Sequence, residues 1–262
     1  MIDAEGGDTT DMALKEQFNE PWKTYFNGDE VLHLRRLKLK VSRSDLLKPF
    51  AEARPGKSLM LFCRRLSFCV KRMKNKGTVE SSFCIRPTPF GPVVMLWSVF
   101  GDQPKIFRVL LSRPGATARH QVSVLFPDSI GSSCSEINVV AGDIEAFLSG
   151  ENIEFSLEVV CMDTCSGFQQ EVLRAEHGIP RGSVSTYQRI ARHLSSPNAA
   201  RAVGNALASN LFPIIIPCHR AIRSDRSLGG YQGGLEMKRT LLEMEGIEFD
   251  DSGRAVTENF FY

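Results

Sequence analysis

The residues best suited to chemistry are Cys218 and His219, which follow the apolar run at residues 214–217. A thiolate is the nucleophilic form of cysteine, and an imidazole close to it can accept the thiol proton. A carboxylate on the far nitrogen of the imidazole would fix its tautomer and stabilise the imidazolium. The pair therefore indicates nucleophilic chemistry, although a cysteine behind an apolar run is, taken alone, more often a small buried side chain.

The flanks of this motif narrow its meaning. The segment PCHR is preceded by RAVGNALASNLFPIII and followed by GGYQGGLEMKRTLLEMEG. This arrangement resembles the O6-alkylguanine-DNA alkyltransferases, also called methylated-DNA–protein-cysteine methyltransferases. The resemblance is dense over residues 168–246, looser over 87–160, and does not reach residues 1–85. It implies direct-reversal DNA repair, in which an alkyl group moves irreversibly and once from O6-alkylguanine, with O4-alkylthymine as a further substrate, to Cys218.

The resemblance also implies the catalytic groups. His219 acts on the thiol through a bridging water, and Glu245, which lies 27 residues after Cys218, supplies the carboxylate. Expelling guanine as an anion is costly unless a donor meets the developing charge. By the resemblance this donor is Tyr187, and Asn210 ties the preceding helix to the active-site strand.

The family pattern places other residues around the flipped base. The backbone N–H of Gln232 donates to O6, the carbonyl of Ala221 reads the exocyclic amine together with that of Cys218, and Tyr231 forms a pocket wall. Lys238 is placed among the substrate-binding residues. Reaching a paired base requires flipping it out of the duplex, and this family does so from the minor groove. The residues that the resemblance places against DNA are Arg201 as the intercalating side chain, with Ala200, Ala202, Tyr187 and Arg220.

Each residue has a plainer interpretation when taken alone. His219 could be a structural histidine, Glu245 a surface acid at a helix end, and Arg201 a solvated helix charge. The joint spacing decides against these interpretations: 14 residues separate Tyr187 from Arg201, 17 separate Arg201 from Cys218, and 13 separate Cys218 from Tyr231. All three agree with the family.

Two other functions stay open. An alkyltransferase-like damage sensor would flip the base without chemistry, but the cysteine position in such proteins is typically replaced. A transcriptional regulator would use a helix-turn-helix and bind a specific operator, but the zinc-thiolate module expected of it is missing. Sequence-specific binding at a stated salt concentration would favour the regulator.

The elements that must position these residues fall into two groups. The first group predicts a small antiparallel sheet with a helix, from strands at 92–100, 105–112, 120–126 and 153–159 and a helix at 142–150. The second group is helical after residue 164. Ser166 with Gln169 and Ser185 with Gln188 are capping-box patterns, and Ser196 with Pro197 predicts the start of a third helix that ends near Asn210 in a left-handed residue. Helices at 187–194 and 198–209 then form a helix-turn-helix candidate, the run at 214–216 a buried strand, and residues 235–246 a last helix.

The predicted fold class is α/β, with a small ribonuclease-like antiparallel-sheet domain followed by a winged-helix-like domain that contains the helix-turn-helix. The predicted division is an extension of uncertain order at 1–85, the α/β domain at 86–160, the alkyltransferase and DNA-binding domain at 161–249 and a tail at 250–262.

Composition sets the remaining expectations. The 262 residues are 42% hydrophobic and 24% charged, and no apolar run is long enough to span a bilayer. We expect an intracellular monomer, nuclear if eukaryotic and otherwise cytoplasmic, that binds double-stranded DNA carrying O6-alkylguanine and no membrane. The seven cysteines are odd in number and irregularly spaced, which favours free thiols. No cofactor is required; some relatives hold a structural zinc, but its ligands cannot be identified here.

The net charge of +2 hides an uneven distribution. Residues 1–30 carry eight acids against two lysines, whereas residues 57–76 carry seven basic residues and no acid. The basic segment is either a solvated face or a contact for phosphate or a nuclear-import receptor.

Overall fold

The computed structural model describes residues 31–34, 39–42 and 80–262. The chain divides into two compact units, Met1–Pro55 and Gly56–Tyr262. In the first unit, β1 (Val31–Leu34) and β2 (Leu39–Ser42) pair as an antiparallel hairpin, which the sequence analysis did not anticipate. The basic segment at 57–76 lies outside the described residues. Within the described ranges, no helix is both long and apolar enough to cross a membrane.

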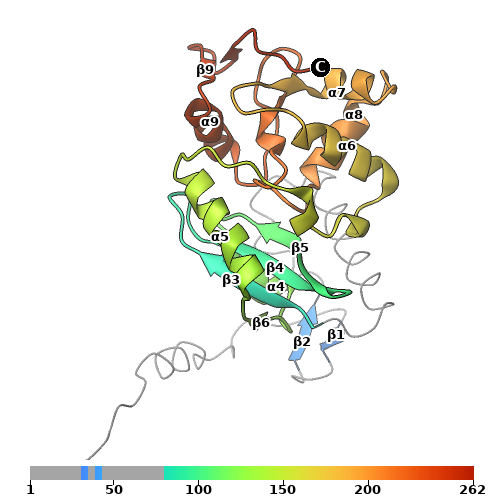
Figure 1. Cartoon of the computed structure of the whole chain (residues 1–262), viewed down its shortest axis with the longest axis vertical. Coiled ribbons are helices and arrows are strands. Elements are labelled where there is room, and N and C mark those ends of the chain that lie inside the picture. Colours follow the sequence, from blue (N-terminus) through green and yellow to red (C-terminus); the bar gives the residue numbers. More distant parts are fainter. Residues whose placement is uncertain (1–30, 35–38, 43–79) are drawn as a thin grey trace, which may run out of the picture. The chain divides into compact units, whose positions relative to one another are not determined.

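A four-stranded sheet forms the first half of the second unit (Figure 1). Its strands are β3 (Ser82–Arg86), β4 (Val93–Phe100), β5 (Gln103–Leu110) and β6 (Ile130–Gly131), in the order β5-β4-β3-β6. The β3–β4 and β4–β5 pairs are antiparallel, as expected from the hairpin pattern, and the short β6 adds in parallel. The sheet thus begins at β3, before the boundary predicted at residue 86.

Helices cover both faces of this sheet. Met95 and Trp97 of β4 face a cluster that includes α5 (Ser135–Leu148), whereas Val94 and Leu96 face a cluster that includes α4 (Ala118–Leu125). Because successive side chains of a strand point to opposite faces, a strand covered on both faces is apolar throughout. This arrangement explains the continuous apolar run of β4.

Two strand predictions in this half are wrong. Residues 120–126 belong to α4, whose buried Ala118 and Val122 have the spacing of a helix and whose cap is the Thr117 side chain. Residues 153–159 form no strand and contain only the 3₁₀ helix η1 (Leu157–Val159). Their alternate apolar side chains still pack against the core. The alternation of apolar and polar residues therefore indicated burial of one side of the segment, and not a strand. The helix expected at 142–150 is confirmed but begins earlier, at the start of α5.

The second half is mainly helical, as predicted, and contains α6 (Gly167–His177), α7 (Tyr187–His193), α8 (Ala200–Ala208) and α9 (Leu235–Met244). In Figure 1, these helices lie beyond the end of the sheet, with α7 beside α8. The short hairpin of β9 (Glu248–Phe249) and β10 (Ala255–Val256) follows α9.

The helix ends differ in part from the sequence predictions. Ser166 caps α6 as predicted, since its hydroxyl accepts from the N–H of Gln169. The cap of α7 is Thr186 and not Ser185, whose hydroxyl instead donates to the carbonyl of Phe261. α8 begins after Ala199, which provides no side-chain cap, so the predicted start at residue 196 falls in the preceding turn.

One hydrophobic cluster connects the two halves. It contains Val109 of β5, Ile144 of α5, Leu173 of α6 and Leu241 of α9, and the N–H of Val109 donates to the carbonyl of Leu211 at 2.8 Å. The boundaries at 160 and 249 stay predictions, but the segment after residue 249 is packed: its last residues, Phe261 and Tyr262, contact the same cluster. A continuous core of this kind holds the sheet and the helices in a fixed arrangement around the residues between them.

Candidate active site

A two-residue parallel pair brings the two predicted reactive side chains together. β7 (Ser185–Thr186) pairs with β8 (Ala221–Ile222), with Ser185 opposite Ala221. Tyr187 follows β7 directly, and Cys218 opens the 3₁₀ helix η3 (Cys218–Arg220) that leads into β8. This pairing therefore holds together the two segments that carry the tyrosine and the cysteine, although 31 residues separate these two residues.

The segment before Cys218 is a strained turn and not the predicted strand. Ile214 adopts a φ of +77°, which is rare for a β-branched residue and costs on the order of 1–3 kcal/mol. The side chains of the Ile214–Ile216 run are buried as expected, so the core keeps the turn in place. Strain of this kind persists only where surrounding contacts determine the conformation.

Asn210 links this turn to the thiol. Its side-chain amide donates to the carbonyl of Ile216 at 3.0 Å and to Sγ of Cys218 at 3.2 Å, while its side-chain oxygen accepts from the N–H of Phe212. Asn210 follows α8 and is fully buried, in agreement with the predicted linking role. It does not adopt the predicted left-handed conformation. An N–H that points at the sulfur stabilises a thiolate more than a thiol.

His219 and Glu245 form the predicted hydrogen bond. Nε2 of His219 lies 2.9 Å from Oε1 of Glu245, and both side chains are almost completely buried. With the Nε2 proton donated to the carboxylate, the neutral imidazole has its acceptor at Nδ1. This Nδ1 is buried and has no hydrogen-bond partner among the described residues. His219 therefore keeps an unused proton-acceptor site.

Arg220 lies on the other side of the same carboxylate. Its Nε and Nη2 donate to the two oxygens of Glu245 at 2.9 and 2.8 Å, and its third nitrogen donates to the carbonyl of Ile179. Its side chain is 9% exposed. The structure therefore contradicts the predicted DNA contact of Arg220, because its guanidinium is engaged inside the protein. A bidentate pair fixes the orientation of the carboxylate and also stabilises its negative charge.

The pKa values follow from this arrangement. Burial raises the pKa of the Cys218 thiol to about 12, although the hydrogen bond from Asn210 lowers it. Burial lowers the pKa of His219, against the hydrogen bond and charge of Glu245. Burial raises the pKa of Glu245, but the hydrogen bonds and charges of His219 and Arg220 outweigh this effect and lower it to about 2. The resting site is thus a neutral thiol, a neutral imidazole and a carboxylate.

Lys238 is held inside the protein by two backbone carbonyls. Its ammonium is completely buried and donates to the carbonyls of Ala221 and Leu228, each at 2.6 Å. Burial lowers its pKa to about 8. Lys238 thus ties α9 to the loop after β8 and does not present its charge to a substrate, which corrects its predicted role. The carbonyl of Ala221, expected to read the exocyclic amine, is already one of its acceptors.

The loop before α9 contacts both His219 and the end of α8. The ring of Tyr231 lies edge-on to His219 with 6.3 Å between centroids, and its predicted place in the wall around the base stays a prediction. Its hydroxyl is buried and has no partner among the described residues. The side chain of Gln232 donates to the carbonyl of Asn210 at 2.6 Å, which joins this loop to the end of α8. The role predicted for the backbone N–H of Gln232 stays a prediction.

Tyr187 packs closely against Gly229. A Cβ at Gly229 would lie 2.6 Å from the Tyr187 hydroxyl, and Gly229 has a φ of +69°. Glycine is required there both by the conformation and by the close approach. Burial, followed by the charges of Glu176 and Cys218, raises the pKa of Tyr187 to about 12, so the phenol keeps its proton and can donate it.

The predicted DNA-contacting residues of α8 lie on its outer face. Arg201 and Ala202 are exposed and Ala200 is half-buried, whereas Val203, Ala206 and Leu207 are buried. The helix is therefore amphipathic, with Arg201 and Ala202 directed outward and Ala200 at the edge of the buried face. It packs against α7, as the helix-turn-helix prediction requires.

Glu176 is a fully buried acid on α6 that was not among the residues predicted from the sequence. Neither of its carboxylate oxygens has a hydrogen bond of good geometry among the described residues. Burial raises its pKa to about 8, against the opposing charges of Lys238 and Arg220 and the nearby amide of Ala221. The signal was its position, since it follows buried Val172 and Leu173 at helical spacing on the apolar face.

Among residues 31–34, 39–42 and 80–262, no group of three or more histidine, cysteine or acidic side chains is placed to hold a metal ion. The cysteines of these ranges are free thiols.

Comparisons with known proteins agree with this site. Residues 167–247 match the family model of the 6-O-methylguanine DNA methyltransferase DNA-binding domain. The methylated-DNA–protein-cysteine methyltransferase of Methanosarcina acetivorans is 32% identical over 164 residues, which cover 63% of this chain and 97% of that protein. That of Methanothermobacter thermautotrophicus is 42% identical over 114 residues, or 44% of this chain and 64% of that protein. The chain belongs to the methylated-DNA–protein-cysteine methyltransferase family.

The fold agrees as well. A crystal structure of a Mycobacterium tuberculosis OGT variant is 29% identical, with a TM-score of 0.50 over 63% of this chain and 92% of that chain. The chain spans just under two thirds of the length of several relatives that it matches, such as those from Methanothermobacter thermautotrophicus and Haemophilus influenzae. The α/β class and the alkyltransferase resemblance predicted from the sequence are therefore confirmed.

Proposed function

We propose that this protein repairs DNA by transferring an alkyl group from O6 of guanine to Cys218 in a single turnover. The observation that carries the proposal is the order of contacts around the sulfur. Asn210 donates to Sγ, and the neighbouring His219 has a free Nδ1 while Glu245 holds its Nε2. A thiol whose pKa is raised to about 12 needs such a base before it can attack carbon.

The reaction balances with the groups present. The thiol proton moves to Nδ1 of His219, directly or through a water, and Glu245 stabilises the imidazolium. The sulfur of Cys218 bonds to the alkyl carbon, the bond from that carbon to O6 breaks, and its electron pair stays on the base. Tyr187 donates a proton to the guanine and regains one from the imidazolium by way of solvent. The products are a thioether and neutral guanine. None of the groups named here can cleave the carbon–sulfur bond of the thioether, so the thiol is not regenerated.

The partner in this proposal is double-stranded DNA. Cys218 is only 6% exposed, so a guanine inside a duplex cannot reach it without leaving the stack. We place the outer face of α8 in the minor groove with Arg201 filling the gap, as in the family pattern. We expect the protein to act as a monomer.

The test is a mass measurement on the peptide that contains Cys218. After incubation with a duplex that carries one O6-methylguanine, this peptide should gain one methyl group, in an amount that does not exceed the amount of protein. Cys218→Ala should abolish the gain and keep duplex binding. Loss of O6-methylguanine from the DNA with an unmodified peptide would refute the proposal. Tight, lesion-selective binding without methyl transfer would identify a damage sensor.

A further inference from the structure

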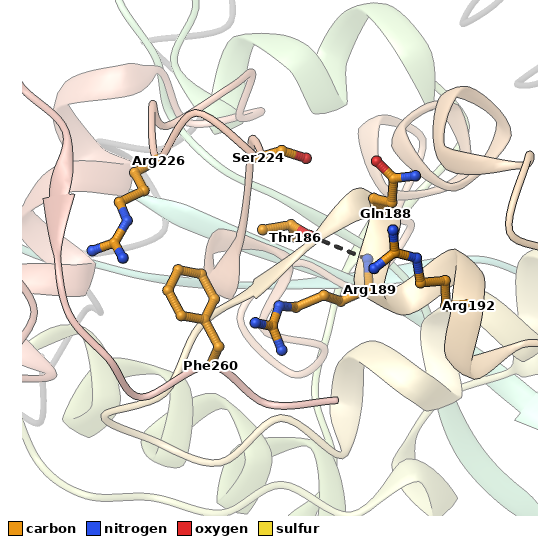
Figure 2. A pocket seen from close by; sticks show the side chains of 7 residues that line it. All are labelled: Thr186, Gln188, Arg189, Arg192, Ser224, Arg226 and Phe260. Carbon is orange, nitrogen blue, oxygen red and sulfur yellow. Dashed lines mark hydrogen bonds between the residues drawn. The ribbon is translucent and has the colours of Figure 1, made fainter.

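A surface pocket of about 290 Å³ lies beside α7 and is rich in hydrogen-bond donors (Figure 2). Three of its residues are arginines, Arg189 and Arg192 from α7 and Arg226 from the loop after β8. The neutral side chains of Thr186, Gln188 and Ser224 also line it, and Phe260 completes it. No lining residue carries a carboxylate, so the pocket suits an anion.

The C-terminal segment 259–262 builds one side of this pocket. The N–H of Val184 donates to the carbonyl of Asn259, and the N–H of Phe261 donates back to the carbonyl of Val184, so the segment runs beside the residues that lead into β7. The ring of Phe260 lies between two guanidinium groups, 4.9 Å from that of Arg189 and 5.4 Å from that of Arg226. Residues 259–262 lie beyond the match to the family model, which ends at residue 247.

The three arginines differ in how many donors remain free. Arg189 donates to the carbonyl of Tyr262, and Arg226 donates to the carbonyl of Thr257 and to Glu258, whose side chain is 89% exposed. Arg192 is exposed and has no side-chain partner among residues 80–262. Two guanidinium groups are thus held in place by the C-terminal segment, while the third has all its donors available.

The pocket shares its framework with the active site. Thr186 ends β7 and precedes Tyr187, and Ser224 follows β8 by two residues. An anion held there would lie on the β7–β8 pair that also positions Tyr187 and Cys218. A guanidinium matches the geometry of phosphate oxygens, and neutral N–H and O–H groups add to such a site.

We propose that this pocket, completed by residues 259–262, binds one backbone phosphodiester of the DNA and so fixes the duplex relative to the active site. The inference rests on the proposed function and adds to it a binding site whose arginines lie within the matched domain and whose remaining side, residues 259–262, lies outside it. It assigns the last four residues a role in DNA affinity and assigns Arg192 the main phosphate contact.

The test compares Arg192→Gln and Phe260→Ala with wild type in duplex binding over a range of salt concentrations. Each ionic phosphate contact contributes about 0.9 to the slope of log K against log salt. Arg192→Gln should lower this slope by about one and weaken binding about three- to tenfold at moderate salt, for all sequences alike. Phe260→Ala should act in the same direction through the two arginines that it separates. Arg174→Gln, which removes an exposed charge from α6, is the matched control and should leave the slope unchanged.

A second arm locates the phosphate and separates the DNA backbone from free phosphate. In a series of duplexes, each carries one neutral methylphosphonate linkage near the lesion. At one position in this series, the neutral linkage should weaken binding by the wild type but not by Arg192→Gln. Inorganic phosphate, compared with chloride at equal ionic strength, should compete only weakly. Equal losses in both proteins at every linkage, or an unchanged salt slope in Arg192→Gln, would overturn the inference.

Methyl transfer by the wild-type protein, measured with the same duplexes, keeps the two proposals apart. Absence of transfer to Cys218 by wild type would refute the proposed function. Transfer by wild type together with unchanged binding by the pocket variants would refute only the role of the pocket.

Discussion

Glu245, in the interior, is 7% exposed and is held by His219 and Arg220, whereas Arg192 and Arg201, on the surface of α7 and α8, are exposed. In the proposed function, the interior residues depend on orientation, because the hydrogen bonds of Glu245 to His219 and Arg220 fix how these side chains point. In the proposed function, the surface residues act on DNA through their charge and shape, and salt in the surrounding water screens the charge. One substitution in the interior should therefore have a large effect that salt does not change, and one on the surface a smaller effect that salt modulates.

Glu245→Gln should have the largest effect. The amide cannot pair both His219 and Arg220 as a carboxylate does, and it leaves the Arg220 guanidinium buried without a counter-charge. Breaking a buried ion pair costs about 3–5 kcal/mol, so the substitution should lower the free energy of unfolding by about this amount. Urea denaturation would measure the change. Loss of the imidazolium's partner should slow single-turnover methyl transfer by about a hundredfold or more.

The control for this variant is Glu243→Gln on the same helix. Glu243 pairs with Arg239, and both side chains are 45% exposed. Removing that pair should cost less than about 1 kcal/mol and leave transfer unchanged. Similar losses in the two variants would show that the interior network has no special role.

Glu176→Gln should change how stability depends on pH. Burial raises the pKa of Glu176 to about 8 from an ordinary value of 4.5. Between these values the folded protein holds a proton that the unfolded chain has released, so rising pH lowers stability over this window. The amide does not titrate, so the substitution should remove that contribution: the variant should be close to wild type at pH 5 and more stable at pH 8.

The comparison of unfolding free energies at pH 5 and pH 8 has its own control in Glu171→Gln, an exposed acid on α6. The lowered pKa of Lys238, about 8 from 10.5, acts in the opposite direction above pH 8, so the measurement should stay at or below that value. A difference between Glu176→Gln and wild type that is the same at both pH values would contradict the prediction.

Gly229→Ala should displace the side chain of Tyr187 and leave Cys218 unchanged. The alanine would adopt an unfavourable positive φ, at about 1 kcal/mol or more, and its Cβ would displace the Tyr187 hydroxyl. We expect methyl transfer to slow by about tenfold, as when a positioned proton donor is moved out of line. Gly230→Ala is the matched control, since no atom lies within 4 Å of its Cβ position. Equal rates in the two variants would exclude Tyr187 as the donor.

The sequence predicted the catalytic contacts better than the elements that carry them. The chemistry requires a base for the thiol of Cys218 and a carboxylate for that base, which led to the prediction of His219 and Glu245. The structure brings His219 and Glu245 into contact. The run before Cys218 was predicted as a strand because burial and apolar character are common to strands and to buried turns. A positive φ at Ile214 cannot be deduced from residue type, since isoleucine disfavours it.

The roles of charged residues were the hardest to predict. Arg220 and Lys238 look like surface cations in the sequence, and both are buried by partners from distant segments, Ile179 and Glu245 in one case and Leu228 in the other. Such pairings depend on tertiary contacts that no local pattern encodes. Glu176 could have been found, because its spacing places an acid on an apolar helix face.

Arg201→Ala should have an effect no larger than that of Gly229→Ala, and it tests whether surface shape matters beyond charge. If Arg201 fills the gap left by the flipped base, its loss should slow transfer from a paired lesion by about tenfold, because unstacking a base costs a few kcal/mol and the gap is no longer filled. Arg201→Lys keeps the charge but not the planar group, so it should recover the salt dependence of binding while recovering only part of the rate. With the lesion in a single strand, where no base pair must open, the rates of wild type and Arg201→Ala should converge. Equal loss on single and double strands would mean that Arg201 contributes only charge, and the surface of α8 would then differ from the pocket beside α7 in position alone.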